Sequence, residues 1–371
     1  LHLCDRRQRQ MCIRDRKNNS EEIIVNLKDV NRLIDKVTLD VDKSANYKLR
    51  LWLDFGDLED EAKEALVGQK IFLALKINGI QNVNKVPTGA DTLIKLTDNK
   101  DNSGLYTITH AKDSTLQIGN DKDITEYRYR GASPKNYVTF NNETWRILGV
   151  FPTDDGTGKI ENRIKIIKDQ SIGNKYWDTV NSNNWARPAT LNTELNTTYL
   201  NSLDSASKSM IGNTKYYLGG KSLTYNNGYA DTPLQFYSYE RKIQNTTSNE
   251  FYNGTNPNSW VGKLGLMYVS DYGYASSNCE NKRIYDYNSS ANDIRACNDT
   301  NWLYNIKAIE WLLPQNASLS GGAFCVKADG RVDSLDISKF QFVVRPVLYL
   351  ISSAKITGGD GTIGSPYTLG L

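Results

Sequence analysis

The chain has 371 residues, a net charge of +3 and 39% hydrophobic residues, so it can bury a sizeable core and is not disordered throughout. The balanced charge, without a long Lys/Arg run, argues against a nucleic-acid-binding surface. No stretch approaches the roughly 20 apolar residues of a membrane-spanning helix. The 22 tyrosines and 27 glycines are typical of a β-rich protein with long loops, and tyrosine enrichment is also typical of an AT-rich genome.

Residues 1–16 differ in composition from the rest of the chain. They are rich in arginine, whereas later residues favour lysine, and the string from Met11 to Arg16 is typical of a translated sequencing adapter. We therefore exclude this segment from the predicted fold, with a basic arm as the alternative. Because the chain begins at Leu1, we also expect that a signal peptide has been lost by N-terminal truncation.

Residues 20–85 are predicted to form part of a β-sandwich. Apolar residues recur at every second position in four stretches, a pattern typical of half-buried strands. Good helix formers at 58–67 interrupt the series as a short helix or loop. The four stretches are 23–27, 37–41, 47–53 and 71–77.

Residues 86–130 are predicted to be a connector. The stretch from Asp98 to Gly104 consists of turn-forming residues. Its Asp/Asn spacing is similar to that of a calcium loop, but the glutamate that closes an EF-hand loop is missing at the required offset. We therefore interpret it as a solvated loop.

The larger domain is predicted to span residues 131–371. A hairpin with two apolar strands around Asn141-Asn142 opens it, and a strand at 160–167 follows. Apolar residues spaced by four predict a helix at 189–203, with a second short helix at 205–211. Residues 216–260 are expected to be mostly loop, and a buried strand is expected at 261–268.

The run from Phe342 to Leu350 is predicted to be the closing strand of this domain. Pro346 cannot donate to a sheet ladder, which indicates an edge or a bulge. Arg345 is a cation within an apolar run, so it needs a buried partner. We expect a structural ion pair with Glu143 or Glu310, and we expect the two ends of the domain to meet.

Three sets of segments resemble known families. An uncharacterised family of Gram-positive bacterial surface domains is similar to the stretches NYVTFNNETWRILGVF, GKLGLMYVSDYGYA and VRPVLYL. The succession WLLP, AFCV and VRPVLYL also resembles the end of C-type-lectin-like folds, which include the formylglycine-generating sulfatase modifiers. In the N-terminal part, YKLRLWLD and GQKIFLALKING resemble secreted sandwich domains of the biofilm-matrix and camelysin type.

These resemblances imply an α+β protein. An N-terminal partial β-sandwich would precede a larger C-type-lectin-like mixed domain with two short helices and long loops. They further imply a secreted or cell-surface adhesion module, whose partner is a glycan or a surface or matrix protein, or which packs in an extracellular matrix, without catalysis. Fold resemblance alone does not carry function.

The sequence contains few candidate residues for catalysis. After residues 1–16, the only histidine is His110, which lies in the predicted connector, so a Ser-His or Cys-His arrangement within residues 131–371 is excluded. A formylglycine-type oxidase needs a cysteine pair, but Cys325 stands alone in an apolar segment and is predicted to be buried. A glycosidase needs only two carboxylates, for which Asp178, Asp271 and Glu310 are available.

Cys279 and Cys297 enclose a polar segment that cannot bury itself. A disulfide between them would stabilise the domain and implies an oxidising, extracellular location, with two free thiols as the alternative.

The loops that follow residue 216 combine aromatic and polar side chains, as glycan sites do. From them we predict Trp260, Asp271, Tyr272 and Tyr274 as binding residues. No cofactor is expected, although calcium bound through Asp271 stays open. We expect Trp145, Trp302 and Trp311 to be core residues, because leucine and isoleucine flank them.

Overall fold

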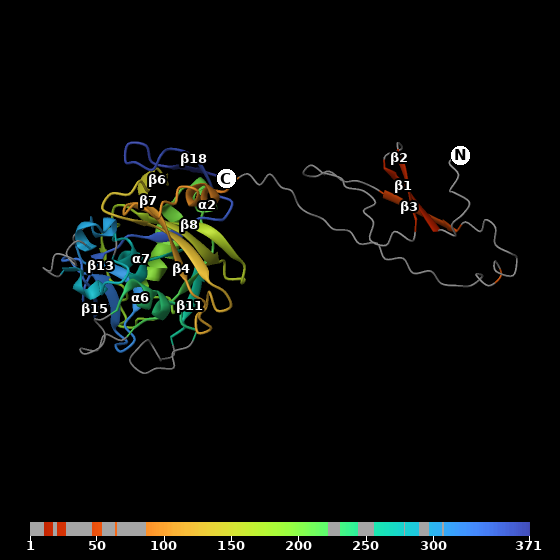
Figure 1. The fold of residues 1–371 in the computed structure, drawn as a ribbon. Helices are drawn as coiled ribbons and strands as arrows, with labels where there is room; N and C mark the ends of the chain where they lie inside the picture. Colours follow the sequence, from red (N-terminus) through yellow and green to blue (C-terminus); the bar gives the residue numbers. More distant parts are fainter. Residues whose placement is uncertain are drawn as a thin grey trace. The chain divides into compact units, whose positions relative to one another are not determined.

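The computed structural model divides the chain into two compact units, residues 1–85 and 86–371. Both units are drawn in Figure 1. Short helices accompany mixed and antiparallel sheets, so the protein belongs to the α+β class that the sequence predicts. The structure describes residues 11–17, 21–26, 47–53, 64, 87–221, 231–243, 256–277, 279–288, 297–305 and 308–371.

The described part of the first unit is a three-stranded antiparallel sheet. Its central strand is β1 (Met11–Lys17), which pairs with β2 (Glu21–Asn26) and β3 (Tyr47–Leu53). Residues 11–16, which the sequence prediction leaves out of the fold, thus lie on the central strand of this sheet, because an extended backbone can complete a ladder whatever its side chains. The strands expected at 37–41 and 71–77 lie outside the described residues.

A seven-stranded sheet forms one layer of the second unit. Its path is β12-β17-β8-β7-β5-β4, and β6 pairs with β7 beside this path. Neighbouring strands are antiparallel throughout. The strands are β4 (Gly104–His110), β5 (Ile124–Arg130), β6 (Tyr137–Phe140), β7 (Glu143–Asp154), β8 (Ile160–Lys168), β12 (Leu264–Gly265) and β17 (Val347–Tyr349).

Residues 86–130 are not a connector. Their strands β4 and β5 extend the seven-stranded sheet, in which β5 pairs with β7 beside Gly149. A side chain at Gly149 would place its Cβ 2.0 Å from the carbonyl oxygen of Tyr127, so this close approach requires glycine. The turn-rich stretch at 98–104 leads into β4. Because this stretch is polar, the sequence predicts a connector over the whole region and not the strands β4 and β5.

The hairpin predicted at the start of the larger domain is confirmed. β6 and β7 pair around Asn141 and Asn142, whose φ angles are 54° and 56°. Two consecutive residues with positive φ are typical of the type I′ turn, and asparagine tolerates that conformation well. The hairpin places Trp145 at the centre of the core, where it is buried.

A five-stranded sheet forms a second layer, in the order β15-β14-β13-β16-β9. Trp311 lies on its central strand and is buried, as is Trp302, so the core positions predicted for both tryptophans are confirmed. The strands are β9 (Asn174–Lys175), β13 (Glu310–Gln315), β14 (Gly322–Val326), β15 (Val332–Asp336) and β16 (Phe342–Val343).

The predicted closing strand changes sheets at Arg345-Pro346. Its first part is β16 in the five-stranded sheet, and its second part is β17, which pairs with β8 in the seven-stranded sheet. Proline suits the crossing point because no ladder bond is needed there. Arg345 donates from Nε and Nη2 to the two carboxylate oxygens of Glu310, at 2.7 Å each. The expected ion pair is therefore confirmed with Glu310, whereas Glu143 pairs with Lys168.

Helix α7 (Val269–Tyr274) contacts both sheets, through β5 and β13, and packs beside α6 (Pro233–Glu240) (Figure 1). The long loop expected at 216–260 therefore contains a helix, which a Thr232–Gln235 capping box begins. The helix predicted at 189–203 is present in three continuous pieces. The other helices are α2 (Gly89–Ile94), α3 (Thr190–Glu194), η1 (Leu195–Tyr199), α4 (Leu200–Ser202), α5 (Ser205–Ser209), η2 (Ile284–Asn288) and η3 (Trp302–Asn305).

The two smaller sheets are antiparallel pairs of strands. β10 (Thr214–Tyr217) pairs with β11 (Ser259–Gly262), and β18 (Lys355–Gly358) pairs with β19 (Thr368–Gly370). The C-terminal segment returns to the opening hairpin, where the backbone N–H of Tyr367 donates to the carbonyl oxygen of Tyr137 at 2.9 Å and Val138 forms a parallel bridge with Tyr367. The two ends of the predicted domain therefore meet.

Replacing Arg345 by alanine is expected to destabilise the second unit strongly. The change leaves the carboxylate of Glu310 buried without its cation, which typically costs about 3–5 kcal/mol. Equilibrium denaturant unfolding measures the loss. The comparison variant Glu143→Ala removes a carboxylate that is 37% exposed and pairs with Lys168, and should cost about 0–1 kcal/mol. Equal effects of the two variants would contradict the structural role of Arg345.

Candidate functional site

Three of the four residues predicted to bind a ligand lie inside the protein. Asp271, Tyr272 and Tyr274 belong to α7 and are buried between the sheets. The Tyr272 hydroxyl donates to the carbonyl of Gly330 at 2.7 Å. The prediction of a surface site at these residues is therefore corrected: an aromatic-rich segment after a short strand forms a core helix, because its rings supply the apolar area that joins two sheets.

Trp260 is half-buried on β11. Its ring packs against Tyr216 and Trp185, with centroid distances of 5.7 and 6.4 Å. A Cβ at position 262 would lie 1.8 Å from the Trp260 ring, so Gly262 is what lets this ring fold over the backbone. Trp260 therefore contributes mainly to packing.

Asp271 is the centre of a buried charge cluster. Its Oδ1 accepts from Arg128 Nη1 at 2.9 Å, and its Oδ2 accepts from Lys165 Nζ and from the backbone N–H of Tyr268. Arg128 also donates from Nε to Glu126 at 2.9 Å. Cations and anions are equal in number in this central charge cluster, which consists of Glu126, Arg128, Lys165, Glu240, Arg241 and Asp271.

Burial and pairing act in opposite directions on these groups. Burial lowers the pKa of Lys165 to about 8, although Asp271 partly opposes the shift. Burial also disfavours the Asp271 carboxylate, but Lys165 and Arg128 outweigh it and hold the pKa of Asp271 below its usual value. Burial raises the pKa of Glu240, whose carboxylate accepts from the backbone N–H of Ser270 at 2.9 Å.

His110 extends the cluster at the end of β4. Its ring stacks on Tyr237 at 3.5 Å, and the guanidinium of Arg241 lies 3.7 Å from the centroid of the Tyr237 ring. His110 Nε2 lies 3.3 Å from Glu126, while burial lowers the pKa of the imidazole. His110 was expected in a connector and is instead part of the core, because β4 is a strand of the main sheet.

The three carboxylates considered for glycoside hydrolysis are all engaged in ion pairs. Asp178, Asp271 and Glu310 are buried, and each pairs with a cation. A hydrolase needs carboxylates that reach a substrate, so these three do not form such a site. Among the described residues, no group of three or more His, Cys, Asp or Glu side chains is arranged to hold a metal ion, and calcium at Asp271 would displace Lys165 and Arg128.

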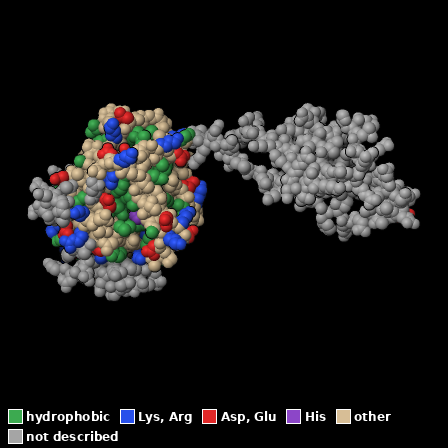
Figure 2. All heavy atoms as spheres, in the orientation of Figure 1, with side chains coloured by type: hydrophobic (Ala, Val, Ile, Leu, Met, Phe, Trp, Pro, Cys, Tyr) green, Lys and Arg blue, Asp and Glu red, His purple; other side chains and the backbone are tan. Residues whose placement is uncertain are grey.

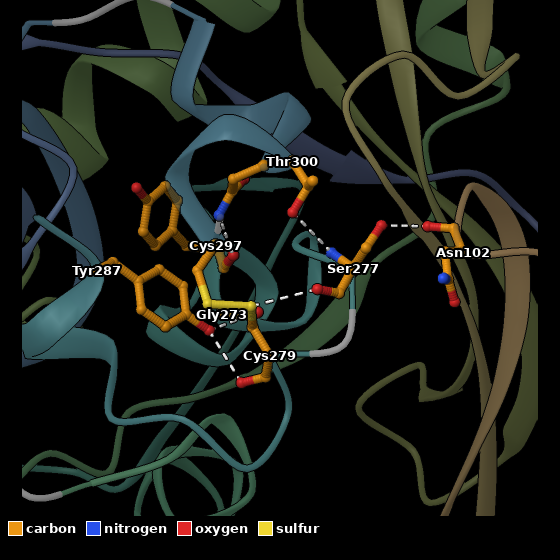
Figure 3. The surroundings of a disulfide bond; sticks show 9 residues. Asn102, Gly273, Ser277, Cys279, Tyr287, Cys297 and Thr300 are labelled. Atoms are coloured by element: carbon orange, nitrogen blue, oxygen red, sulfur yellow. Dashed lines mark hydrogen bonds between the residues drawn. A yellow bond between two sulfur atoms is a disulfide. The ribbon is translucent and has the colours of Figure 1, made fainter. Parts of the chain in front are cut away.

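The cysteines have the arrangement that the sequence predicts. Cys279 and Cys297 form a disulfide, with their Cα atoms 5.9 Å apart. Figure 3 shows Tyr287 beside it, where its hydroxyl lies 3.1 Å from the Gly273 carbonyl oxygen and 3.2 Å from that of Cys279. The bond thus fixes the segment that leaves α7. Cys325 is fully buried on β14, so this cysteine gives the oxidase alternative no accessible thiol.

An accessible aromatic surface lies on the five-stranded sheet instead. Phe340 is 47% exposed and stacks on half-buried Phe342, with ring centroids 5.7 Å apart and planes 10° apart. Phe342 rests on buried Trp311, and its cross-strand partner is Lys175. The Lys175 ammonium lies 2.6 Å from Glu194 Oε1, and both side chains are 33% exposed. We call Phe340, Phe342, Lys175 and Glu194 the aromatic platform.

Sequence reasoning missed the aromatic platform. The alternation Phe340-Gln341-Phe342 was a usable indication, because residues two apart on an extended chain share one face. The surface in Figure 2 otherwise intersperses Lys and Arg with Asp and Glu on the face of the second unit in view. Among the described residues, no helix is long and apolar enough to cross a membrane.

Comparisons with known proteins give no relative. No family model, no curated protein and no solved structure matches this chain.

Reduction of the Cys279–Cys297 disulfide is expected to lower the melting temperature. In the loop-entropy model, opening a loop of this size costs roughly 3 kcal/mol. Calorimetry with and without a thiol reductant measures the shift. The double variant Cys279→Ser/Cys297→Ser should melt lower in both conditions and show no response to reductant. A reductant-insensitive wild-type protein would contradict the structural role of the bond.

The thiol of Cys325 is expected to resist alkylation in the folded protein at mildly alkaline pH. Burial raises the pKa of the Cys325 thiol well above its usual value, and only the thiolate reacts readily. Mass spectrometry after treatment with iodoacetamide counts the labelled thiols. A label at Cys325, located by peptide mapping, is expected only after denaturation without reductant, whereas rapid labelling of Cys325 in the native protein would show that β14 opens.

Proposed function

We propose that the second unit is an extracellular recognition module that binds a carbohydrate at the aromatic platform. The stacked, solvent-exposed ring of Phe340 is the observation that carries this proposal. An exposed aromatic face has a negative centre, which suits the polarised C–H groups on the flat side of a sugar ring. The rigid support from Phe342 and Trp311 means that little side-chain freedom is lost on binding.

Lys175 and Glu194 supply the polar half of such a site. The ammonium donates hydrogen bonds and the carboxylate accepts them, so together they can satisfy sugar hydroxyl groups that point either way. Their ion pair is partly exposed, so a ligand can approach it without crossing the core. An apolar face bordered by a few polar groups is the usual composition of a ligand site.

The Cys279–Cys297 disulfide supports the extracellular location, because such bonds persist in oxidising surroundings. The described residues do not favour catalysis, since their buried carboxylates and Cys325 already have structural positions. An adhesion or matrix role requires recognition and a stable scaffold only. A resemblance to C-type-lectin-like surface domains is compatible with this proposal.

A glycan-array screen with the full chain tests the proposed function, with and without calcium. We expect binding of at least one glycan class in both conditions. Phe340→Ala should weaken binding about tenfold or more, equivalent to ~1.4 kcal/mol, with an unchanged melting temperature.

The matched control is Ile363→Ala, which truncates a side chain that is 74% exposed on a different surface segment. It should leave glycan binding unchanged. Wild-type protein that binds no glycan, or Phe340→Ala that binds as tightly as wild type, would overturn the proposal. Retention of a surface protein instead of a glycan would assign the platform to protein recognition.

A further inference from the structure

Lys165 and Asp271 form a buried pair that the proposed function does not use. Lys165 lies on β8 and Asp271 on α7, and both side chains are at most 1% exposed. The Lys165 Nζ contacts Asp271 Oδ2 in the middle of the core. The amine is enclosed by aromatic rings, with centroids at 4.5 Å for Tyr268, 5.1 Å for Tyr349 and 5.4 Å for Phe151.

This environment weakens the charged form of Lys165, whereas Lys165 and Arg128 hold the pKa of Asp271 below its usual value. A buried ion pair loses the hydration of both ions, and the mutual attraction often fails to repay that loss. Burial lowers the pKa of Lys165 to about 8, so an appreciable fraction of a neutral, nucleophilic amine is accessible at mildly alkaline pH. The aromatic rings keep out water that would compete for the carboxyl group.

The two oxygens of Asp271 are held in different ways. Oδ1 accepts from Arg128 Nη1 at 2.9 Å, and Oδ2 contacts the amine and accepts from the backbone N–H of Tyr268 at 2.8 Å. A nucleophile that attacks the carboxyl carbon places negative charge on one oxygen, and a guanidinium already bonded to that oxygen stabilises it. The pair thus has a nucleophile, an electrophile and an oxyanion partner in place.

We propose that Lys165 and Asp271 condense into an intramolecular amide bond that joins β8 covalently to α7. A proton first passes from the ammonium to Oδ2, which gives a neutral amine and a carboxylic acid. The amine nitrogen then bonds to the Asp271 carboxyl carbon, the bond from that carbon to Oδ2 breaks, and the departing hydroxyl takes a proton from the nitrogen. One water molecule leaves, and nothing is oxidised or reduced.

The product fits the surrounding charges. The amide keeps Oδ1 as a carbonyl oxygen, which can still accept from Arg128. Removing one cation and one anion leaves Arg128 and Arg241 against Glu126 and Glu240, so the central charge cluster remains balanced. This modification is independent of any ligand at the aromatic platform, which lies on β9, α3, β16 and the residues just before β16.

Mass spectrometry of the intact, reduced chain tests the proposal directly. We expect the wild-type mass to be lower than the sequence mass by one water molecule. Proteolysis should release a branched peptide in which residues 165 and 271 are joined. A chain with the full sequence mass, after prolonged incubation of folded protein at mildly alkaline pH, would overturn the proposal.

Two variants and one control exclude other losses of water. Lys165→Arg keeps the positive charge but lacks an amine, and Asp271→Ala lacks the carboxyl group, so both should show the full mass. Lys168→Arg changes a neighbouring lysine on the same strand, which pairs with Glu143, and should retain the loss. If Lys165→Arg still loses water, the loss is a cyclic imide at an aspartate, and the amide between Lys165 and Asp271 is refuted.

Discussion

The position of helix α7 depends on the buried carboxylate of Asp271. This group caps the helix through the backbone N–H of Tyr268, and it accepts from Arg128 on β5 and Lys165 on β8. Helix α7 contacts both large sheets, through β5 and β13. The Asp271 carboxylate links this helix to the seven-stranded sheet, which contains β5 and β8. Hydrophobic packing alone would hold these layers together without fixing the rotation of α7, whereas directional charge-assisted bonds do fix it.

The chain itself also passes from one layer to the other at Arg345-Pro346. The chain leaves the five-stranded sheet after β16 and enters the seven-stranded sheet at β17, with Arg345-Pro346 between them. At this point Arg345 turns inward to Glu310 on β13 and to the carbonyl oxygen of Leu303. The crossing and the central charge cluster thus act in the same way, because at each place oppositely charged buried side chains pair with one another and hold neighbouring elements in position.

Most aromatic residues serve this interior. Tyr216, Tyr237, Tyr268, Tyr272 and Tyr287 are all nearly inaccessible, and several pack against the cations of the cluster. Cation–π contacts and ring packing make buried arginine and lysine less costly. Tyrosine abundance therefore says little about ligands in this protein, and the candidate for recognition is the pair of exposed Phe340 and half-buried Phe342, which buried Trp311 supports.

The sequence by itself determined local features whose cause is local. The Asn141-Asn142 hairpin follows from the conformational tolerance of asparagine, the helix near Leu191 from apolar spacing, and the Cys279–Cys297 bond from a polar segment that needs an anchor. Arg345 was also identifiable, because a cation in an apolar run requires a partner, although the choice of Glu310 over Glu143 was not.

The tertiary structure alone decided which polar and aromatic residues face inward. Asp271 and Tyr272 have the composition of a binding loop, and His110 follows a turn-rich segment, yet all three lie in the core because strands far apart in sequence close around them. The aromatic platform likewise depends on the pairing of β16 with β9, and the residues between these two strands make up more than half of the second unit. Burial depends on partners that are distant along the chain, so no local pattern of residues specifies it.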